Sequence, residues 1–397
     1  MISVETAFQR IVEKATPLSN ERTKLADCSG RVLSGAISAR RSQPGTDVSA
    51  MDGYAVKSSD LTCDEVLFKL IGESAAGAPF NGAVKSGETV RIFTGASVPK
   101  GADQVVIQEN TGPSEGGIFT TDAPSANKNI RAMGYDFLEK QVVLDKGTFL
   151  TPKSLGIAAS AGHSHLMVHR APHIAFLATG DELVSPDSKD FSAHVTVNST
   201  VPQLSSMVSD IGALPIDMGQ AGDDLKSLKK AIASADNADI LVTIGGASVG
   251  DRDFMQQALA EEGMQLDFWK VAMKPGKPLI FGRKGKQIIL GLPGNPVSAF
   301  VCAMIYLRPL VDKLMGRPAP LPTGIPLPSA TALKSNGPRQ NYMRARLIGG
   351  QGERHVDAAV SQDSSQLSVL AQSDGLIVRE PNAEAVEAGT LVPFIPF

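Results

Sequence analysis

Short apolar runs alternate with longer amphipathic segments between residues 171 and 316. Four apolar runs predict buried strands: HIAFLATG, ALPIDMG, DILVTIGG and IILGLPG. The segments that separate or follow them have apolar residues at helical spacing: VPQLSSMVSDIG, DDLKSLKKAIASA, DFMQQALAEEG and VSAFVCAMIYLRPLVDKL. Strands that alternate with helices predict a parallel sheet with helices on both faces. Ligands of such sheets bind at the carboxyl ends of the strands, where this chain has glycine-rich turns.

The segments on either side of this region have different patterns. Residues 1–40 read as helical, with apolar positions at Val4, Phe8, Ile11 and Val12, and residues 152–169 read as a helix followed by the short strand LMVHR. Between them, short apolar runs separated by Gly, Pro, Asn and Ser turns predict a β-rich module. We therefore expect a helical domain in two segments, 1–44 and 146–170, with a β-rich insert at 45–145. After the proline-rich segment Arg317–Pro328, residues 317–397 predict a small β-barrel.

Composition narrows the class of protein. The chain has 397 residues and a net charge of −3, which excludes a basic field over the whole chain for nucleic acid. Three cysteines lie far apart without a CxxC pair, which is typical of a reducing cytoplasm. The N-terminal segment lacks the apolar core of a signal peptide, and no apolar run reaches the length of a membrane span. We expect a cytoplasmic protein that binds neither nucleic acid nor membrane.

The glycine-rich turn after DILVTIGG is the first candidate binding element. Gly245 and Gly246 would let the backbone approach a ligand and direct N–H groups at an anion. The turn does not match GxGxxG, so a dinucleotide site is not predicted. Asp251 and Asp253 follow, and at this stage helix capping and metal or ligand contact are equally good interpretations.

Two further turns have the chemistry of an anion site. WKVAMKPGKP places Lys270, Lys274 and Lys277 around a Pro-Gly turn, and ammonium groups held together favour an anion between them; solvated surface lysines are the alternative. In LPGNPVSAF, Asn295 predicts a helix N-cap, and the helix start with the Ser298 hydroxyl suits an oxyanion.

Carboxylates supply the remaining candidates. Asp181 and Glu182 follow the strand HIAFLATG and are of the type that ligates Mg²⁺, although a turn or helix cap explains them equally well. Asp52 lies beside Gly53 in the β-rich insert, where a β-turn is the alternative. The histidines of HSHLMVH lack any Cys or HExxH partner, so we do not predict a zinc site.

The order of seven motifs along the chain is more specific than any one of them. SAMDGYAV, RIFTGASVP, NIRAMGYD, TGDEL, GGASVGDRD, KPGKP and GLPGNPVSA follow one another, and the chain closely resembles the MoeA family from about residue 5 to the C-terminus. This family of molybdopterin molybdenumtransferases includes the E domain of gephyrin. The resemblance implies a multidomain α/β plus β fold: a MogA-like α/β molybdopterin-binding domain with a parallel-rich sheet, a β-rich insert, a helical linker domain and a C-terminal β-barrel. It also implies a homodimer, in which the α/β domain faces the partner's β-rich insert.

The resemblance implies a reaction as well. Molybdenum passes from molybdate to adenylylated molybdopterin with Mg²⁺ or a similar divalent cation, and AMP is released. A transient contact with a MogA-like adenylyltransferase and with molybdoenzyme maturation factors is also implied. The implied metal ligands are Glu182, Asp223 and Asp253, and the implied catalytic residues are Asp52, Asp136, Glu182, Asp223, Asp253, Lys270 and Lys274. The implied substrate-binding residues are Thr94, Gly245, Gly246, Ser248, Lys274, Lys277, Pro278, Gly294, Asn295, Ser298, Arg339, Arg344 and Ser364.

Two other functions stay open from the sequence. A non-catalytic homologue of the same fold would bind molybdopterin or act as a scaffold, but such a protein has no need for the lysines and carboxylates that this chain retains. An adenylylating MogA-like enzyme is disfavoured by KPGKP and by the additional β modules.

Overall fold

The computed structural model describes residues 1–189, 191–246, 254–350 and 353–397. These residues form two compact units. We call residues 1–21, 30–32 and 169–397 the large unit, and residues 22–29 and 33–168 the small unit. Each is described by itself.

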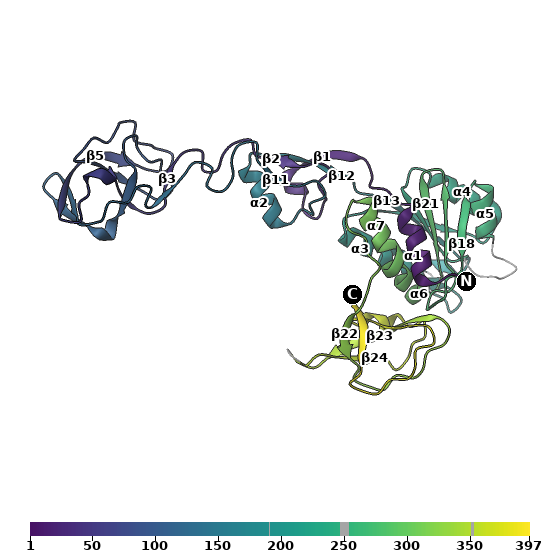
Figure 1. The fold of residues 1–397 in the computed structure, drawn as a ribbon. Coiled ribbons are helices and arrows are strands. Elements are labelled where there is room, and N and C mark those ends of the chain that lie inside the picture. The colour runs from purple at the N-terminus through teal and green to yellow at the C-terminus, as the bar shows by residue number, and fades with distance from the viewer. Residues whose placement is uncertain (190, 247–253, 351–352) are drawn as a thin grey trace. The chain divides into compact units, whose positions relative to one another are not determined.

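A six-stranded sheet forms the centre of the large unit (Figure 1). Its order is β16 (Leu214–Ala221), β13 (His173–Thr179), β17 (Ile240–Ile244), β21 (Gln287–Leu292), β20 (Ile280–Lys284) and β18 (Gln265–Trp269). The first four strands are parallel, whereas β20 is antiparallel to both of its neighbours. The sheet is therefore rich in parallel strands, as expected. Its antiparallel strand β20 arises because the hairpin between β20 and β21 reverses the chain at Gly285 (φ +58°).

Helices cover both faces of this sheet, as the alternation of apolar residues predicts. Ile174, Phe176 and Ala178 of β13 pack on one face, with a cluster that includes residues of α1 (Val4–Glu13), α3 (Thr200–Asp210), α6 (Pro296–Cys302) and α7 (Arg308–Leu314). Ala175 and Leu177 point to the other face, under α4 (Leu225–Ser234) and α5 (Met255–Glu261). A π-helical segment, Ala303–Leu307, joins α6 to α7, so the predicted helix after GLPGNP is continuous but not uniform.

The C-terminal strands form the predicted small barrel. Their order is β24 (His355–Ala358), β23 (Gln340–Ile348), β25 (Gly375–Arg379), β26 (Leu391–Pro396) and β22 (Ile325–Pro328). A bridge between Ser329 and Val356 brings the end of β22 back to β24 and closes the ring. One further strand, β19 (Met273–Lys274), lies parallel to the start of β23 and joins the KPGKP segment to the barrel. The barrel also contains the short helix α8 (Leu367–Ala371).

The small unit consists mainly of another six-stranded sheet. Its order is β7 (Gln104–Ile107), β4 (Gly53–Val56), β6 (Glu88–Ile92), β5 (Val66–Ser74), β9 (Gly117–Thr120) and β8 (Thr111–Ser114). Two-stranded pairs join β3 (Val48–Ser49) to β10 (Ile130–Arg131) and β2 (Ile37–Ser38) to β11 (Val142–Leu144), and α2 spans Pro152–Ser160. Residues 45–145 therefore consist largely of strands and the turns between them.

The N-terminal segment is less helical than its pattern predicts. Helix α1 ends at Glu13, and β1 (Asn20–Lys24) then pairs with β12 (His165–His169). Apolar residues at helical spacing occur only in the first turns of this segment, and the charged run NERTK fits an exposed strand. The division of the chain into four domains at the expected boundaries stays a prediction. In the described residues, no helix is both long enough and apolar enough to span a membrane.

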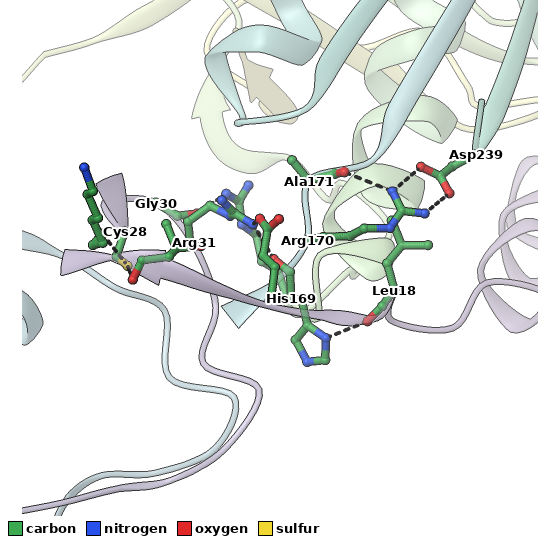
Figure 2. A network of polar contacts seen from close by, with 12 residues as sticks. Leu18, Cys28, Gly30, Arg31, His169, Arg170, Ala171 and Asp239 are labelled. Atoms are coloured by element: carbon green, nitrogen blue, oxygen red, sulfur yellow. Dashed lines mark hydrogen bonds and ion pairs between the residues drawn. The ribbon is translucent and has the colours of Figure 1, made fainter. Parts of the chain in front are cut away.

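An ion pair fixes the start of the central strands (Figure 2). Asp239, just before β17, accepts two hydrogen bonds from the Arg170 guanidinium at 2.7 and 2.5 Å, and a third from the His173 N–H at 2.8 Å. Arg170 also donates to the Ala171 carbonyl at 3.2 Å, and His169 Nδ1 contacts the Leu18 carbonyl at 2.9 Å. These bonds set the register of β13 against β17, whose opposite ends carry the candidate site.

Candidate functional site

A cavity of about 930 Å³ opens at the carboxyl ends of β13, β17 and β21 in the large unit. Its size is that of a pocket for a nucleotide-sized ligand. The lining comes from four strand-end turns, from the start of α3 and from the barrel: Thr179, Gly180, Glu182, Leu183, Thr196, Val197, Asn198, Ser199, Thr200, Asp223, Ile244, Gly245, Gly246, Pro278, Pro293, Gly294, Asn295, Pro296, Ser365 and Leu367. The cavity therefore lies at the edge of the sheet where the sequence predicts a ligand.

Bare backbone forms much of the cavity floor. A Cβ atom on Gly245 (φ +93°) would lie 2.8 Å from both the carbonyl oxygen and Oγ1 of Thr179, and one on Gly294 would lie 3.5 Å from the Gly245 Cα. Only glycine fits at position 245, whereas a Cβ atom on Gly294 would make an ordinary van der Waals contact. The Gly245 N–H donates to the Leu292 carbonyl at 3.1 Å, so Gly245 offers a close approach to a ligand rather than the free donor that its motif suggested.

Two of the expected carboxylates line the cavity together. The Glu182 carboxylate lies over Gly180, within 2.8 Å of where a Cβ atom on that glycine would be. Asp223 reaches the cavity from the turn after β16, and its N–H donates to Asp181 Oδ1 at 3.1 Å. The sequence named Asp181 as a candidate Mg²⁺ ligand beside Glu182 in the TGDEL motif, although the family resemblance gave Asp181 no role.

The third expected carboxylate, Asp253, lies outside the described residues, as does Ser248. Within the described ranges, no group of three or more His, Cys, Asp or Glu side chains is placed to hold a metal ion. Two carboxylates on one wall still suit Mg²⁺, because this ion binds through one or two carboxylates together with substrate phosphates and water. This pair of carboxylates therefore fits Mg²⁺ shared with a phosphorylated ligand.

The KPGKP turn lies where the α/β region meets the barrel. Lys274 pairs in β19 with Asn341 of β23, and both Lys274 and Lys277 are exposed. Gly276 packs on the buried Cys302, whose Sγ lies 3.8 Å from the Gly276 carbonyl oxygen. Burial raises the pKa of the Cys302 thiol, so this group stays neutral and acts as packing. Pro278 lines the cavity. Lys274 and Lys277 are not part of the lining and are exposed on the same turn.

The remaining expected lysine and serine have distinct surroundings. Lys270 follows the end of β18 with a positive φ of 73°, and its Nζ lies 3.6 Å from the centre of the Trp269 ring. Ser298 lies in the first turn of α6 and is 5% exposed. Asn295 has the expected N-cap position, but its side chain makes no capping bond and donates instead to the Ser364 hydroxyl at 3.2 Å.

The barrel contributes one loop to the cavity. Ser365 and Leu367 line the cavity, and Ser364 accepts the bond from Asn295. Arg344 is 2% exposed, and its guanidinium donates to the Gln366 and Ser361 carbonyls at 3.3 Å each. Burial holds the pKa of Arg344 below its usual value, with Asp363 opposing this shift. Arg339 makes a longer bond, 3.4 Å, to the Met273 carbonyl. Arg344 therefore shapes the loop that presents Ser364.

The expected residues of the β-rich insert belong to the small unit. Asp52 Oδ1 accepts bonds from the Thr94 N–H at 2.7 Å and the Thr94 hydroxyl at 2.8 Å. These bonds, with a smaller contribution from the Arg91 charge, lower the pKa of Asp52. Asp136 is exposed, and its N–H donates to the Gln43 carbonyl at 2.9 Å. Asp52 and Thr94 thus act as one pair, which neither motif alone had indicated.

The segment from Thr196 to Thr200 was missed as part of the site. Asn198 Oδ1 accepts the Val201 N–H at 3.2 Å at the start of α3, so this turn is held beside the strand ends. Its signal in the sequence is the polar run VNST directly before a helical pattern, which reads as an ordinary helix cap. The histidines of HSHLMVH engage separate partners: the Ser38 carbonyl for His163, the Ser164 hydroxyl for His165 and the Leu18 carbonyl for His169.

Three family models match the chain in succession. Residues 2–162 match the MoeA N-terminal region (domain I and II), residues 175–313 a probable molybdopterin binding domain, and residues 326–397 the MoeA C-terminal region (domain IV). Together these matches include every turn that lines the cavity.

Similar proteins agree with this assignment over the whole length. The molybdopterin molybdenumtransferase of Haemophilus influenzae is 36% identical, with 100% of this chain and 99% of the relative aligned. That of a Nostoc species is 33% identical over 91% of this chain and 85% of the relative. A solved structure of the molybdopterin biosynthesis protein MoeA from a Pyrococcus species superposes with a TM-score of 0.87 at 24% identity, covering 100% of this chain and 99% of that one. At that identity, the structural likeness shows the fold alone.

Proposed function

The chain belongs to the MoeA family, and from this membership we propose that it is a molybdopterin molybdenumtransferase of molybdenum cofactor biosynthesis. We infer that it transfers molybdenum from molybdate to adenylylated molybdopterin with release of AMP, in the cytoplasm. The observation that best supports this is the cavity of about 930 Å³. It is lined by glycine backbone, by the carboxylates of Glu182 and Asp223, and by the N-terminus of α6, a position that suits an oxyanion.

The floor and the barrel loop fit the organic part of the substrate. A flat pterin or nucleotide can approach the backbone at Gly245 and Gly294 because no side chain projects there. The Ser364–Ser365 loop then covers the cavity from the barrel side, and Asn295 holds this loop to the start of α6. The proposal thus gives Gly245, Gly246, Gly294 and Asn295 a binding role.

Cationic and hydroxyl groups next to the cavity suit molybdate. Molybdate is a dianion, and lysine ammonium groups hold such an oxyanion by charge-assisted hydrogen bonds. Lys274 and Lys277 are exposed on the turn that leads to Pro278, and we propose them as direct ligands, with Ser298 and Arg339 beside them. Arg344 contributes by fixing the loop of Ser364, since its guanidinium is buried against loop carbonyls.

The carboxylates of the cavity are proposed to hold Mg²⁺. Glu182 and Asp223 would be its protein ligands, with Asp253 in the same role. When bound, Mg²⁺ supplies charge to offset the negative charge that grows on the phosphate oxygens as the pyrophosphate bond breaks. Asp181 keeps Asp223 in place through the Asp223 N–H.

Release of AMP is the direct test. Purified protein is incubated with Mg²⁺, molybdate and adenylylated molybdopterin, and AMP is measured together with reconstitution of a molybdoenzyme. Asp223→Asn removes a proposed metal ligand and should lower turnover at least about 100-fold. Lys277→Met removes a proposed oxyanion ligand and should lower turnover at least about 10-fold. Lys286→Met is the matched control, because Lys286 is also exposed but lies in the β20–β21 turn at the opposite edge of the sheet. Binding of the substrate without AMP release by the unaltered protein would favour the scaffold function instead.

We propose further that two copies combine to form each complete site. Asp52, Thr94 and Asp136 of one copy would then act in the cavity of its partner. Mixing Asp52→Asn protein with Asp223→Asn protein tests this, because each mixed dimer would contain one site without either substitution. Recovery of about a quarter of the unaltered activity is expected for random exchange of subunits. Activity that stays at the level of the two separate variants would contradict a shared site.

A further inference from the structure

Trp269 and Lys270 form a close pair at the end of β18. The Lys270 Nζ lies 3.6 Å from the centre of the indole, well within the range of a cation–π interaction. Trp269 is partly buried, and it packs against the hydrophobic cluster beneath α4 and α5. The ring is therefore a fixed platform, and the ammonium rests on it.

The backbone at Lys270 is held in a strained conformation. Its φ of 73° belongs to the left-handed region, which a lysine rarely occupies. The strand network imposes this conformation: the Lys270 N–H donates to the Leu279 carbonyl at 3.1 Å, and the Lys270 carbonyl accepts from Ile2 at 3.4 Å. Strain of this kind persists where a side chain must point in one direction, which is common at ligand sites.

The sheet places this pair at the same edge as the cavity. Strand β18 is antiparallel to β20, which is antiparallel to β21, so β18 and β21 end at the same edge. Trp269 pairs with Ile280, and Ile280 pairs with Gly291, which gives one row across three strands. The Trp269 backbone therefore lies about 10 Å, or two strand spacings, from β21. In the cavity lining, Pro278 comes two residues before β20 and Gly294 comes two residues after β21, both at this edge.

The charge of Lys270 has no acidic partner in the described parts of the chain. The ion pairs of this region are made by Lys284 with Asp236 and Glu262, and by Lys14 and Arg10 with Asp267. The Lys270 ammonium lies on an aromatic ring and has no carboxylate partner in the described residues, so it can still donate hydrogen bonds to an oxyanion from solution.

We propose that Trp269 is a positioning residue, which holds the Lys270 ammonium at the rim of the cavity to receive an oxyanion of the substrate. This proposal rests on the proposed function for the identity of the oxyanion, which is molybdate or a phosphate group of the nucleotide. Lys270 contacts the oxyanion, and Trp269 acts only through Lys270.

Intrinsic fluorescence tests the pair without turnover. Trp269 is the only tryptophan of the chain, so all tryptophan emission reports on this site. Molybdate alone, and inorganic phosphate in a parallel titration, should change the emission of the full-length protein in a saturable manner as the ammonium engages the anion. The anion with the lower midpoint identifies the oxyanion. Lys270→Met should abolish the change and Lys286→Met should not. A saturable change of equal size in Lys270→Met, or none in the unaltered protein with either anion, would overturn the proposal.

Steady-state kinetics separate positioning from a structural role. Trp269→Leu should raise KM about fivefold, which corresponds to about 1 kcal/mol, with kcat nearly unchanged. Trp269→Phe should give a smaller increase, because phenylalanine retains a weaker aromatic face. A purely structural Trp269 would instead lower the unfolding temperature and kcat together and leave KM unchanged. If the unaltered protein releases no AMP, the proposed function fails, and the fluorescence titration still decides whether Lys270 binds an oxyanion.

Discussion

The side-chain amide of Asn295 donates to the hydroxyl of Ser364 at 3.2 Å, and this bond connects the start of α6 to a loop of the C-terminal barrel. The two residues are 69 positions apart in the chain. Asn295 and Ser365 both line the cavity, so the bond sets the distance between its floor and its barrel wall. An asparagine at an N-cap normally bonds to its own helix, and its use here for another element connects the two parts of the large unit.

Removal of this bond should weaken substrate binding more than it affects folding. Asn295→Ala is expected to raise KM several-fold, because a mostly exposed hydrogen bond of this kind contributes about 1 kcal/mol. A double-mutant cycle with Ser364→Ala measures the coupling through KM. Effects that add without coupling would contradict a direct role of the bond.

The Asp52–Thr94 pair predicts an acid limb in the pH dependence. Hydrogen bonds from the Thr94 N–H and hydroxyl lower the pKa of Asp52 from its usual value, which favours the ionised carboxylate. Thr94→Val removes the hydroxyl, so the pKa of Asp52 should rise and the acid limb of activity should move to higher pH. A carboxyl NMR titration of Asp52 measures the shift directly. The same shift makes the stability of the fold depend on pH. Because the pKa of Asp52 is lower in the folded protein than in the unfolded chain, ionised Asp52 stabilises the fold above the unfolded pKa. This stabilisation is lost as pH falls through the folded pKa.

Thr121→Val is the control for this substitution. Thr121 is exposed in the same unit and belongs to no strand of the small unit. Its replacement should leave the Asp52 titration unchanged. An equal shift in both variants would mean that Thr94 has no specific effect.

Gly245→Ala should damage the cavity floor. The new Cβ would lie 2.8 Å from two oxygen atoms of Thr179, and φ is +93°. Gly263→Ala is a matched control, because its φ is +91° and no atom lies within 4 Å of the new Cβ. The control should lose about 1 kcal/mol of unfolding free energy from backbone strain alone, and Gly245→Ala about 2 kcal/mol more. Urea unfolding gives these values, and equal losses would show that the floor tolerates a side chain.

The Arg170–Asp239 pair should stabilise the large unit (Figure 2). Asp239→Ala leaves the guanidinium and the His173 N–H without their acceptor, and a loss of about 2–3 kcal/mol is expected. Asp236→Ala is the control, because it also removes an ion pair, with Lys284, but from a site where the aspartate side chain is 53% exposed. That pair should contribute less than about 1 kcal/mol. Comparable losses from both variants in urea unfolding would contradict a special role for Asp239.

The sequence alone determined the order of strands and helices in the α/β region and the edge of the sheet where the cavity opens. Apolar alternation is a local property, so β13, β17 and β21, with the helices between them, could be read directly. Glycine turns and carboxylates at strand ends then identified Gly245 and Glu182, and the family resemblance added Asp223 and Gly294. All four residues line the cavity. The short, charged strand β1 was missed, because its pairing with β12 comes from a segment far along the chain.

Only the tertiary structure decided which of these side chains work together. Asn295 bonds to Ser364, Asp181 holds Asp223, and Arg344 turns to loop carbonyls, and each of these contacts joins residues that no local pattern connects. The strain at Lys270 and its contact with Trp269 likewise depend on the strand bonds on either side. Sequence patterns report the preference of each segment for a helix, strand or turn, whereas hydrogen bonds between distant segments depend on distances that arise only after the chain folds.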